Sequence, residues 1–288
     1  MAANPAVIAI VGPTASGKTS LALKIAEQFD GEIICADSRT VYKDMDIGTA
    51  KPTPEEQARV RHWGLDVATP GDRFTVADFK EYAMAAIADI RSRDKLPLLV
   101  GGTGMYIDAV LYNYSFAGSY NELHREQYQD MTVEDLINYC NNNSIILPEN
   151  YKNKRHLITA IERKSTSSIS KSPLPNDFFV VGIATDKQVL RTRIVERSEQ
   201  LFQNGVAKEA TILGEKYGWD SEAMTGNIYP LLYRYTQGLL TIDQVKDMFG
   251  KSDIQLAKRQ MTWFRRNPDI MWATLNDAEQ YISSLATD

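Results

Sequence analysis

The first hundred residues alternate between short apolar runs and longer segments in which apolar residues recur every three or four positions. Apolar runs over 7–11, 32–36 and 96–100 are too short for helices and predict buried strands. Helical spacing between them predicts helices over 19–29 and 76–93, and a later run over 178–183 precedes another helical pattern that starts near Lys187. This alternation predicts an α/β fold with a parallel sheet flanked by helices.

Residues 114–175 interrupt the alternation. Acidic and Asn-rich helical sequence follows residue 120, loop signals occur near Asn141 and Pro148, and 165–175 forms a polar stretch that predicts a surface loop. We therefore expect a core domain of residues 1–113 and 176–288 with a small helical insertion over 114–175. From about Asp186 the pattern predicts helices only, to the end of the sequence.

Composition narrows the function classes. Hydrophobic residues make up 43% and charged residues 24%, and no apolar run approaches the roughly 18 residues that a membrane span needs. The two cysteines, Cys35 and Cys140, lie in unrelated contexts, which disfavours a disulfide framework and fits the cytoplasm, with both thiols buried. A net charge of −5 argues against a protein that coats nucleic acid nonspecifically.

One stretch runs against that negative balance. Residues 246–266 hold six basic side chains and two aspartates, a local charge of +4: Lys246, Lys251, Lys258, Arg259, Arg265 and Arg266 against Asp247 and Asp253. A solvated helix face explains such a stretch, and a basic groove for nucleic acid is the alternative.

The loop after the first predicted strand reads G-P-T-A-S-G-K-T and fits G-x-x-x-x-G-K-[ST] over eight positions. Glycines in this pattern let backbone N–H groups curl around an anion at a helix N-terminus, the lysine neutralises phosphate oxygens, and the last hydroxyl is placed to ligate Mg²⁺. The sequence thus predicts a phosphate-binding loop formed by Gly12, Pro13, Thr14, Ala15, Ser16, Gly17, Lys18 and Thr19, with Thr19 as the metal ligand.

The loop does not say whose phosphate it binds. The D-x-x-G and N-K-x-D elements of a GTPase are missing from suitable positions. Asp186 follows an apolar run, as a magnesium-binding aspartate of an ATPase would, but A-T-D-K is equally typical of a helix cap. A small-molecule kinase remains open at this point.

Three further segments decide between these readings: A-D-S-R-T-V-Y-K-D-M-D-I-G-T-A-K-P over 36–52, G-G-T-G-M-Y-I over 101–107, and A-K-R-Q-M-T-W-F-R-R over 257–266. Asp37, at a strand end near the phosphate loop, is suited to accept a proton from a nucleophile. Together with the loop, these segments resemble the tRNA dimethylallyltransferase (isopentenyltransferase) family, and the resemblance extends from residue 7 to about 272.

The resemblance implies a P-loop NTPase-like sheet and a specific chemistry. The loop would hold the diphosphate of dimethylallyl diphosphate, and the adenine immediately 3′ of a tRNA anticodon would be flipped into a channel, where its exocyclic amine attacks the allylic carbon. By resemblance, Asp37 is the base, Thr103 orients the diphosphate, and Lys18, Arg197 and Thr19-bound Mg²⁺ stabilise the leaving group. Predicted tRNA contacts are Asp37, Ser38, Arg39, Thr40, Arg155, Lys258, Arg259 and Gln260. The insertion would lie near the anticodon stem, and no obligate protein partner is expected.

The chain departs from the family pattern at several positions. Thr40 replaces a usual glutamine, Thr159 an arginine, and residues 225–230 lack the arginine, glycine and basic residue of an element that contacts tRNA in relatives. Losing positive charges weakens a general electrostatic hold on RNA. Two alternatives therefore remain beside the transferase: a tRNA-binding relative with impaired turnover, and a small-molecule P-loop kinase.

Overall fold

A computed structural model describes residues 5–116, 127–128, 130–148, 151–162, 170–226 and 228–287, without the side chain of Arg155. The chain divides into two compact units, one formed by residues 1–111 and 174–288 and the other by residues 112–173. The division falls two residues from the expected insertion bounds. Of the expected polar loop at 165–175, residues 165–169 lie outside the described residues.

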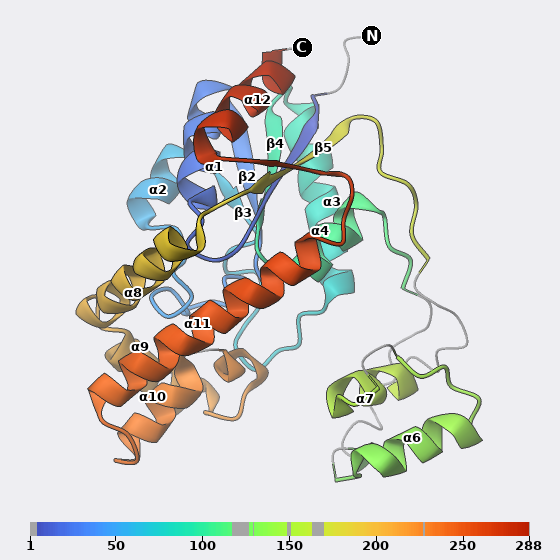
Figure 1. The fold of residues 1–288 in the computed structure, drawn as a ribbon, viewed down its shortest axis with the longest axis vertical. Coiled ribbons are helices and arrows are strands. Elements are labelled where there is room, and N and C mark those ends of the chain that lie inside the picture. The colour runs from blue at the N-terminus through green and yellow to red at the C-terminus, as the bar shows by residue number, and fades with distance from the viewer. Residues whose placement is uncertain are drawn as a thin grey trace. The chain divides into compact units, whose positions relative to one another are not determined.

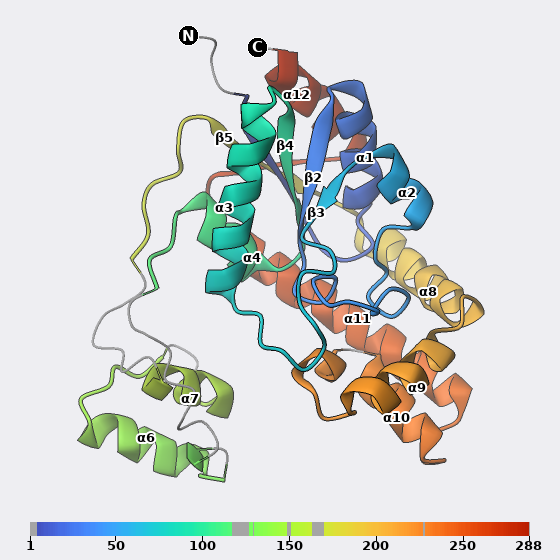
Figure 2. The same ribbon diagram turned by 180° about the vertical axis from the view of Figure 1, so that it is seen from behind.

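The first unit is built on a six-stranded sheet in the order β3-β2-β4-β1-β5-β6, and every pair of neighbours is parallel. Figure 1 and Figure 2 show this sheet from opposite sides. Its strands are β1 (Val7–Val11), β2 (Gly31–Ala36), β3 (His62–Trp63), β4 (Leu96–Gly101), β5 (Phe178–Ile183) and β6 (Ile270–Ala273). The four longest strands are buried almost throughout, as parallel strands covered on both faces must be. The predicted α/β fold with a parallel sheet is confirmed.

Helices cover both faces of the sheet and extend below its carboxyl edge (Figure 1). Helices α1 (Lys18–Gln28) and α12 (Leu275–Thr287) pack on one face around Ile8, Ile10, Leu98 and Val181. Helices α3 (Val76–Ser92) and α4 (Gly104–Leu111) cover the other face (Figure 2). The remaining helices of this unit are α2 (Pro54–Arg59), α8 (Lys187–Gln203), α9 (Val206–Tyr217), the 3₁₀ helix η2 (Glu222–Thr225), α10 (Tyr229–Thr236) and α11 (Ile242–Phe264).

Two short edge strands were not expected. The prediction that the chain is helical from Asp186 onward is wrong at Ile270–Ala273, where β6 pairs with β5 through a register that joins Val180 to Ile270. Strand β3 is only two residues long. Both strands lie at the edges of the sheet, where each pairs on one side only, so neither needs the continuous apolar run that identifies a central strand.

The second unit has its own small core. Helix α6 (Val133–Asn142) begins with a capping box in which Thr132 and Asp135 exchange hydrogen bonds, and it packs with α7 (Lys154–Glu162). Their buried side chains include Leu136, Cys140 and Leu157. The helical character expected for this segment is present in the described residues.

Candidate functional site

The phosphate loop has the backbone that its glycines allow. Gly12 and Gly17 take φ values of 151° and 95°, and Ala15 also lies in the left-handed region at 61°. Gly17 directly precedes α1, so the first N–H groups of the helix face the loop. The Lys18 ammonium donates to the Pro13 carbonyl at 2.7 Å, which folds the side chain over the loop.

Side chains from α8 and α11 fix the loop from outside. The backbone N–H of Thr14 donates to Gln260 Oε1 at 2.8 Å, while Gln260 Nε2 donates to the Gly102 carbonyl at 3.1 Å. Arg197 donates to the Thr14 hydroxyl, and Arg193 donates to the Ser16 carbonyl at 3.3 Å. Gln260 therefore joins the phosphate loop to the G-G-T-G segment.

Close packing explains the glycines of the G-G-T-G segment. A Cβ on Gly101 would lie 2.1 Å from the Ala36 carbonyl oxygen, one on Gly102 2.3 Å from Gln260 Nε2, and one on Gly104 2.2 Å from Trp263 Cδ1. None of these separations is compatible with a real side chain. The segment thus lies in direct contact with the end of β2 and with α11.

This packing brings Thr103 and Asp37 to the same edge. The Thr103 hydroxyl accepts from the Ser38 N–H at 3.1 Å, and its N–H donates to the Ala36 carbonyl at 3.2 Å. The Asp37 carboxylate accepts from the Arg39 N–H at 2.8 Å, which orients it at the carboxyl end of β2. The site therefore combines a fixed carboxylate with a hydroxyl that follows the neighbouring strand, β4.

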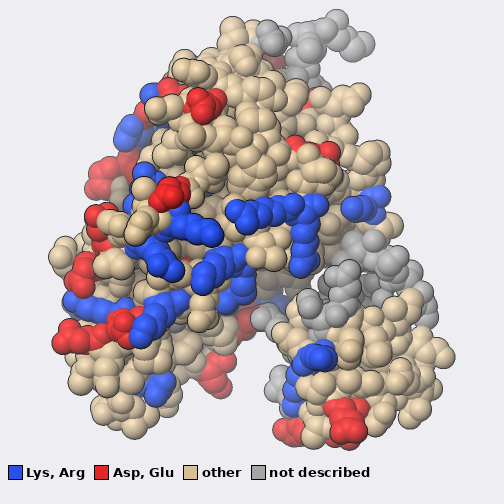
Figure 3. Space-filling model, in the orientation of Figure 1, with Lys and Arg blue, Asp and Glu red and all other residues tan. Residues whose placement is uncertain are grey.

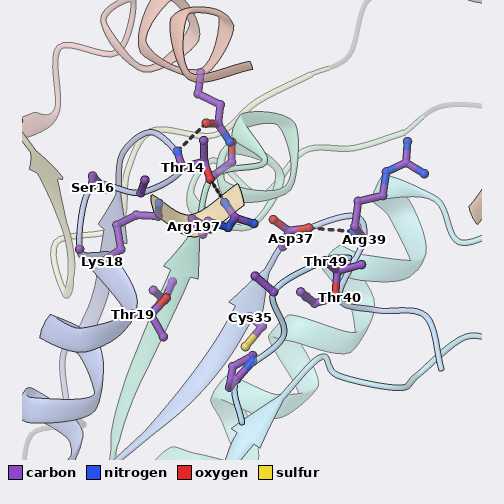
Figure 4. A pocket seen from close by; sticks show the side chains of 18 of the residues that line it. Thr14, Ser16, Lys18, Thr19, Cys35, Asp37, Arg39, Thr40, Thr49 and Arg197 are labelled. Carbon is purple, nitrogen blue, oxygen red and sulfur yellow. Dashed lines mark hydrogen bonds between the residues drawn. The ribbon is translucent and has the colours of Figure 1, made fainter. Parts of the chain in front are cut away.

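The phosphate loop and Asp37 line one cavity of about 980 Å³. Figure 4 shows Thr14, Lys18, Asp37 and Arg197 around it. Desolvation lowers the pKa of Lys18 to about 8; the Asp37 carboxylate opposes this shift and the Arg197 guanidinium adds to it. Those two side chains are therefore close enough to Lys18 to act on its charge.

The structure brings most of the predicted site residues together. Residues 14–19, Asp37, Ser38, Arg39, Thr40, Thr103, Arg197, Arg259 and Gln260 line the cavity. Gly12 and Pro13 are buried behind it, and Lys258 is exposed outside it. Arg155 belongs to α7, and its side chain lies outside the described residues.

Arg39, a predicted tRNA contact, makes hydrogen bonds within the protein. Its guanidinium donates to the carbonyls of Glu222 and Ala223 at 3.1 and 3.2 Å, and it lies within 3.5 Å of the Thr225 hydroxyl. The element in which this chain departs from the family pattern is thus fixed to the D-S-R-T segment. The Thr40 hydroxyl is buried and has no hydrogen-bond partner among the described residues.

A network that the sequence did not indicate supports the same segment. The Glu209 carboxylate accepts from the backbone N–H groups of residues 46–48 at 2.6–3.0 Å and from the Tyr229 hydroxyl at 2.9 Å. Buried Lys51 donates to Asp46 and Asp66 at 2.6 and 2.7 Å. The conspicuous D-M-D-I-G-T-A-K stretch therefore holds a loop in place, a role that only tertiary contacts reveal.

Two open questions from the sequence are answered. Asp186 accepts from the N–H groups of Gln188 and Val189 at the start of α8 and so serves as a helix cap. Both cysteines are buried and free, as predicted, and burial raises the pKa of the Cys35 thiol to about 12. Within the described residues, no helix is long and apolar enough to cross a membrane.

The residues on the cavity wall fit a magnesium ion that is bound partly by the protein and partly by a substrate phosphate. Thr19 lies on the cavity wall with an exposed side chain, and the described residues contain no cluster of three or more His, Cys, Asp or Glu side chains that could hold a metal alone. Magnesium in phosphate-transfer sites is bound by few protein ligands, substrate phosphates and water. Thr19 and a bound diphosphate match that arrangement.

Basic side chains gather on one face of the first unit. Figure 3 shows Lys and Arg over α8 and α11. The exposed members on α11 and just after it are Lys251, Lys258, Arg259, Arg265 and Arg266. An anionic polymer bound there would lie beside the cavity, because Arg259 also lines the cavity.

Comparisons with known proteins agree with the geometry. Residues 40–267 match the IPP transferase family. The chain is 37% identical to a tRNA dimethylallyltransferase of Acetivibrio thermocellus, with 92% of this chain and 90% of that one covered. A relative from Limosilactobacillus reuteri with the same name is also 37% identical, with 92% of both chains covered.

Solved structures share the fold. A tRNA isopentenylpyrophosphate transferase from Bacillus halodurans superposes with a TM-score of 0.75 at 31% identity, covering 98% of this chain and 97% of that one. A eukaryotic dimethylallyltransferase acting on tRNA gives the same TM-score at 21% identity, covering 96% of this chain and 75% of that one, a likeness of fold alone. The expected P-loop NTPase-like sheet is thus shared with these structures.

Proposed function

The chain belongs to the IPP transferase family, and on that premise we propose that it transfers a dimethylallyl group from dimethylallyl diphosphate to the adenine immediately 3′ of the anticodon in tRNA. One observation carries the proposal: the phosphate loop and the Asp37 carboxylate line the same cavity. A prenyl transfer needs a diphosphate site and a base on either side of the reacting carbon.

The donor diphosphate would lie on the phosphate loop. Backbone N–H groups at the start of α1, the Lys18 ammonium and the Arg197 guanidinium would neutralise its charge, and the Thr103 hydroxyl would orient it. Magnesium held by Thr19 and the diphosphate would supply further charge neutralisation when bound. These groups concentrate positive charge at the donor end of the cavity. Such charge is needed there because the leaving diphosphate gains negative charge.

The acceptor amine would approach from the Asp37 side. Its nitrogen attacks C1 of the dimethylallyl group, the C1–O bond to diphosphate breaks, and the amine proton passes to the Asp37 carboxylate. The backbone N–H of Arg39 holds that carboxylate in place. Because the target atom belongs to a base, the adenine must leave its stack to reach a site within the cavity.

RNA would be held by charge rather than by the altered 225–230 element alone. The basic side chains over α8 and α11 lie on the face that includes the cavity-lining Arg259. Arg155 and the unit of residues 112–173 would add contacts to the anticodon stem. We further propose a cytoplasmic enzyme, since its tRNA substrate and free thiols belong there.

The test is transfer of labelled dimethylallyl diphosphate to an anticodon stem-loop that carries three adenines after the anticodon, with Mg²⁺ and without ATP. A prenylated adenine, identified by nuclease digestion and mass spectrometry, supports the proposal. Tight stem-loop binding without product would indicate a tRNA-binding relative with impaired turnover. Neither product nor binding, together with consumption of ATP in the presence of small acceptors, would indicate a kinase.

A further inference from the structure

Asp253 is an unexpected side chain for the wall of an anion-binding cavity. It lies on α11, it is only 3% exposed, and it lines the cavity that the phosphate loop opens into. The other carboxylates on that wall, Asp37, Glu196 and Glu279, are all more exposed. A buried carboxylate is costly unless a cation accompanies it. We therefore expect a cation beside Asp253 and an effect of its charge on the cavity.

Its partner is Arg197. Asp253 Oδ2 lies 3.7 Å from Arg197 Nη1, and the same guanidinium nitrogen donates to the Thr14 hydroxyl of the phosphate loop. Arg197 thus lies between a loop that binds anions and a carboxylate that already carries negative charge. A diphosphate on the loop would have to share this guanidinium with Asp253.

We infer that Asp253 is a counter-ion that competes with diphosphate for Arg197 and so weakens the hold of the phosphate loop on the leaving group. The inference rests on the proposed function and deepens it, because it concerns the diphosphate product. With the cavity empty, Asp253 balances the charge of Arg197. With diphosphate bound, the carboxylate repels the anion and draws on the same donor, which favours release.

The direction of the change in diphosphate affinity when Asp253 is removed distinguishes this role from a purely structural one. Loss of a structural support for Arg197 would weaken diphosphate binding. Loss of a competing carboxylate strengthens it, because the guanidinium is then available to the ligand alone. Where release of product limits turnover, tighter binding also lowers kcat.

The variant Asp253→Asn tests this with inorganic diphosphate as the probe, by calorimetric titration of the full chain. The matched control is Glu199→Gln, because Glu199 pairs with Lys246 at 2.8 Å, also joins α8 to α11, and removes the same charge outside the cavity. We expect Asp253→Asn to lower the Kd for diphosphate about tenfold. Glu199→Gln is expected to leave the Kd within about twofold, as is usual for an exposed pair.

A double variant isolates the competition for Arg197. In an Arg197→Ala background, Asp253→Asn is expected to improve diphosphate binding by much less than in the wild type, because the shared donor is gone. Asp253→Ser provides a second substitution if Asp253→Asn does not fold. Multiple-turnover transfer should slow in Asp253→Asn where release of diphosphate limits turnover.

An unchanged or raised Kd in folded Asp253 variants would overturn the inference while the wild type still binds diphosphate. An equal gain in Glu199→Gln would overturn it too, since general charge would then explain the effect. A wild type that does not bind diphosphate at all would overturn the proposed function along with it.

Discussion

The surroundings of Lys18 bring its pKa close to neutral pH. Desolvation by burial lowers its pKa to about 8, while the Asp37 carboxylate acts against this shift and the Arg197 guanidinium adds to it. Well below this pKa nearly all of the Lys18 side chains are protonated, and above it the neutral amine predominates. A bound diphosphate favours the charged form. Affinity for diphosphate is therefore expected to depend on pH just above neutrality.

We predict that diphosphate binding weakens as pH rises through 8, approaching tenfold per pH unit, since the bound state requires the protonated lysine. The measurement is the Kd for inorganic diphosphate between pH 7 and 9.5. Lys18→Arg is the control, because arginine keeps its charge over this range and the ligand's own ionisation affects both proteins equally. Parallel pH profiles for the two proteins would refute the assignment.

Asp37 is predicted to act on the acceptor rather than on the donor. In Asp37→Asn, kcat for transfer to the stem-loop should fall by about 10²–10⁴, the usual contribution of a general base. Asparagine can still accept the Arg39 N–H, so the local fold should remain. Affinity for inorganic diphosphate is expected to stay the same or rise slightly. A variant with near-normal single-turnover rates would remove Asp37 from the chemistry.

At the scale of elements, contact between the G-G-T-G segment and α11 holds the site together. The Trp263 ring lies where a Gly104 Cβ would be, and its Nε1 donates to Asp108 on α4 at 2.8 Å. We predict that Gly104→Ala lowers the free energy of unfolding by about 1–3 kcal/mol through overpacking. Chemical denaturation followed by circular dichroism measures this.

Gly250 provides a control of opposite sign. It lies within α11, and a Cβ there meets nothing within 4 Å. Gly250→Ala should therefore raise the free energy of unfolding by about 0.5–1 kcal/mol, since alanine is the better helix former. Equal effects of the two substitutions would show that the Trp263 contact does not constrain Gly104.

The sequence predicts the elements whose signals are local. Strands β1, β2, β4 and β5 are continuous apolar runs because helices cover both faces, and α1 and α3 show helical spacing. Strands β3 and β6 escaped prediction because each is short and lies at a sheet edge. These strands form because β2 and β5 offer them hydrogen-bonding partners, and their own hydrophobic pattern does not identify them.

The same division holds for the site. The phosphate loop was evident because its residues are contiguous, and Asp37 and Thr103 each follow a strand. The sequence does not reveal the roles of Gln260, Glu209 and Asp253, because each acts on a segment more than fifty residues away. Only the fold shows that Gln260 contacts Thr14, across 246 positions.

For the whole molecule, charge is distributed unevenly. The chain carries a net charge of −5, yet basic side chains gather over α8 and α11. A polyanion is therefore attracted to this face of the first unit. Binding through such a face releases counterions and depends on salt.

We predict that Lys258→Ala and Arg265→Ala each weaken stem-loop binding and reduce the slope of log K against log salt by about 0.7–0.9 for each phosphate that the variant no longer neutralises. Binding isotherms at several salt concentrations measure this slope. Lys95→Ala is the control, because Lys95 pairs with Asp30 beside the amino end of β4, away from the loop. An equal change in slope for Lys95→Ala would contradict a localised RNA surface.

The contact between Thr14 and Gln260 also has a consequence for synthesis of the chain. A ribosome adds Gln260 246 residues after Thr14, and β6 follows after that. The first strands and α1 precede α11 in the chain, so the loop lacks the partner that fixes its Thr14 amide until α11 has been made. Nascent chains that stop short of α11 therefore carry the complete phosphate-binding motif without the finished site.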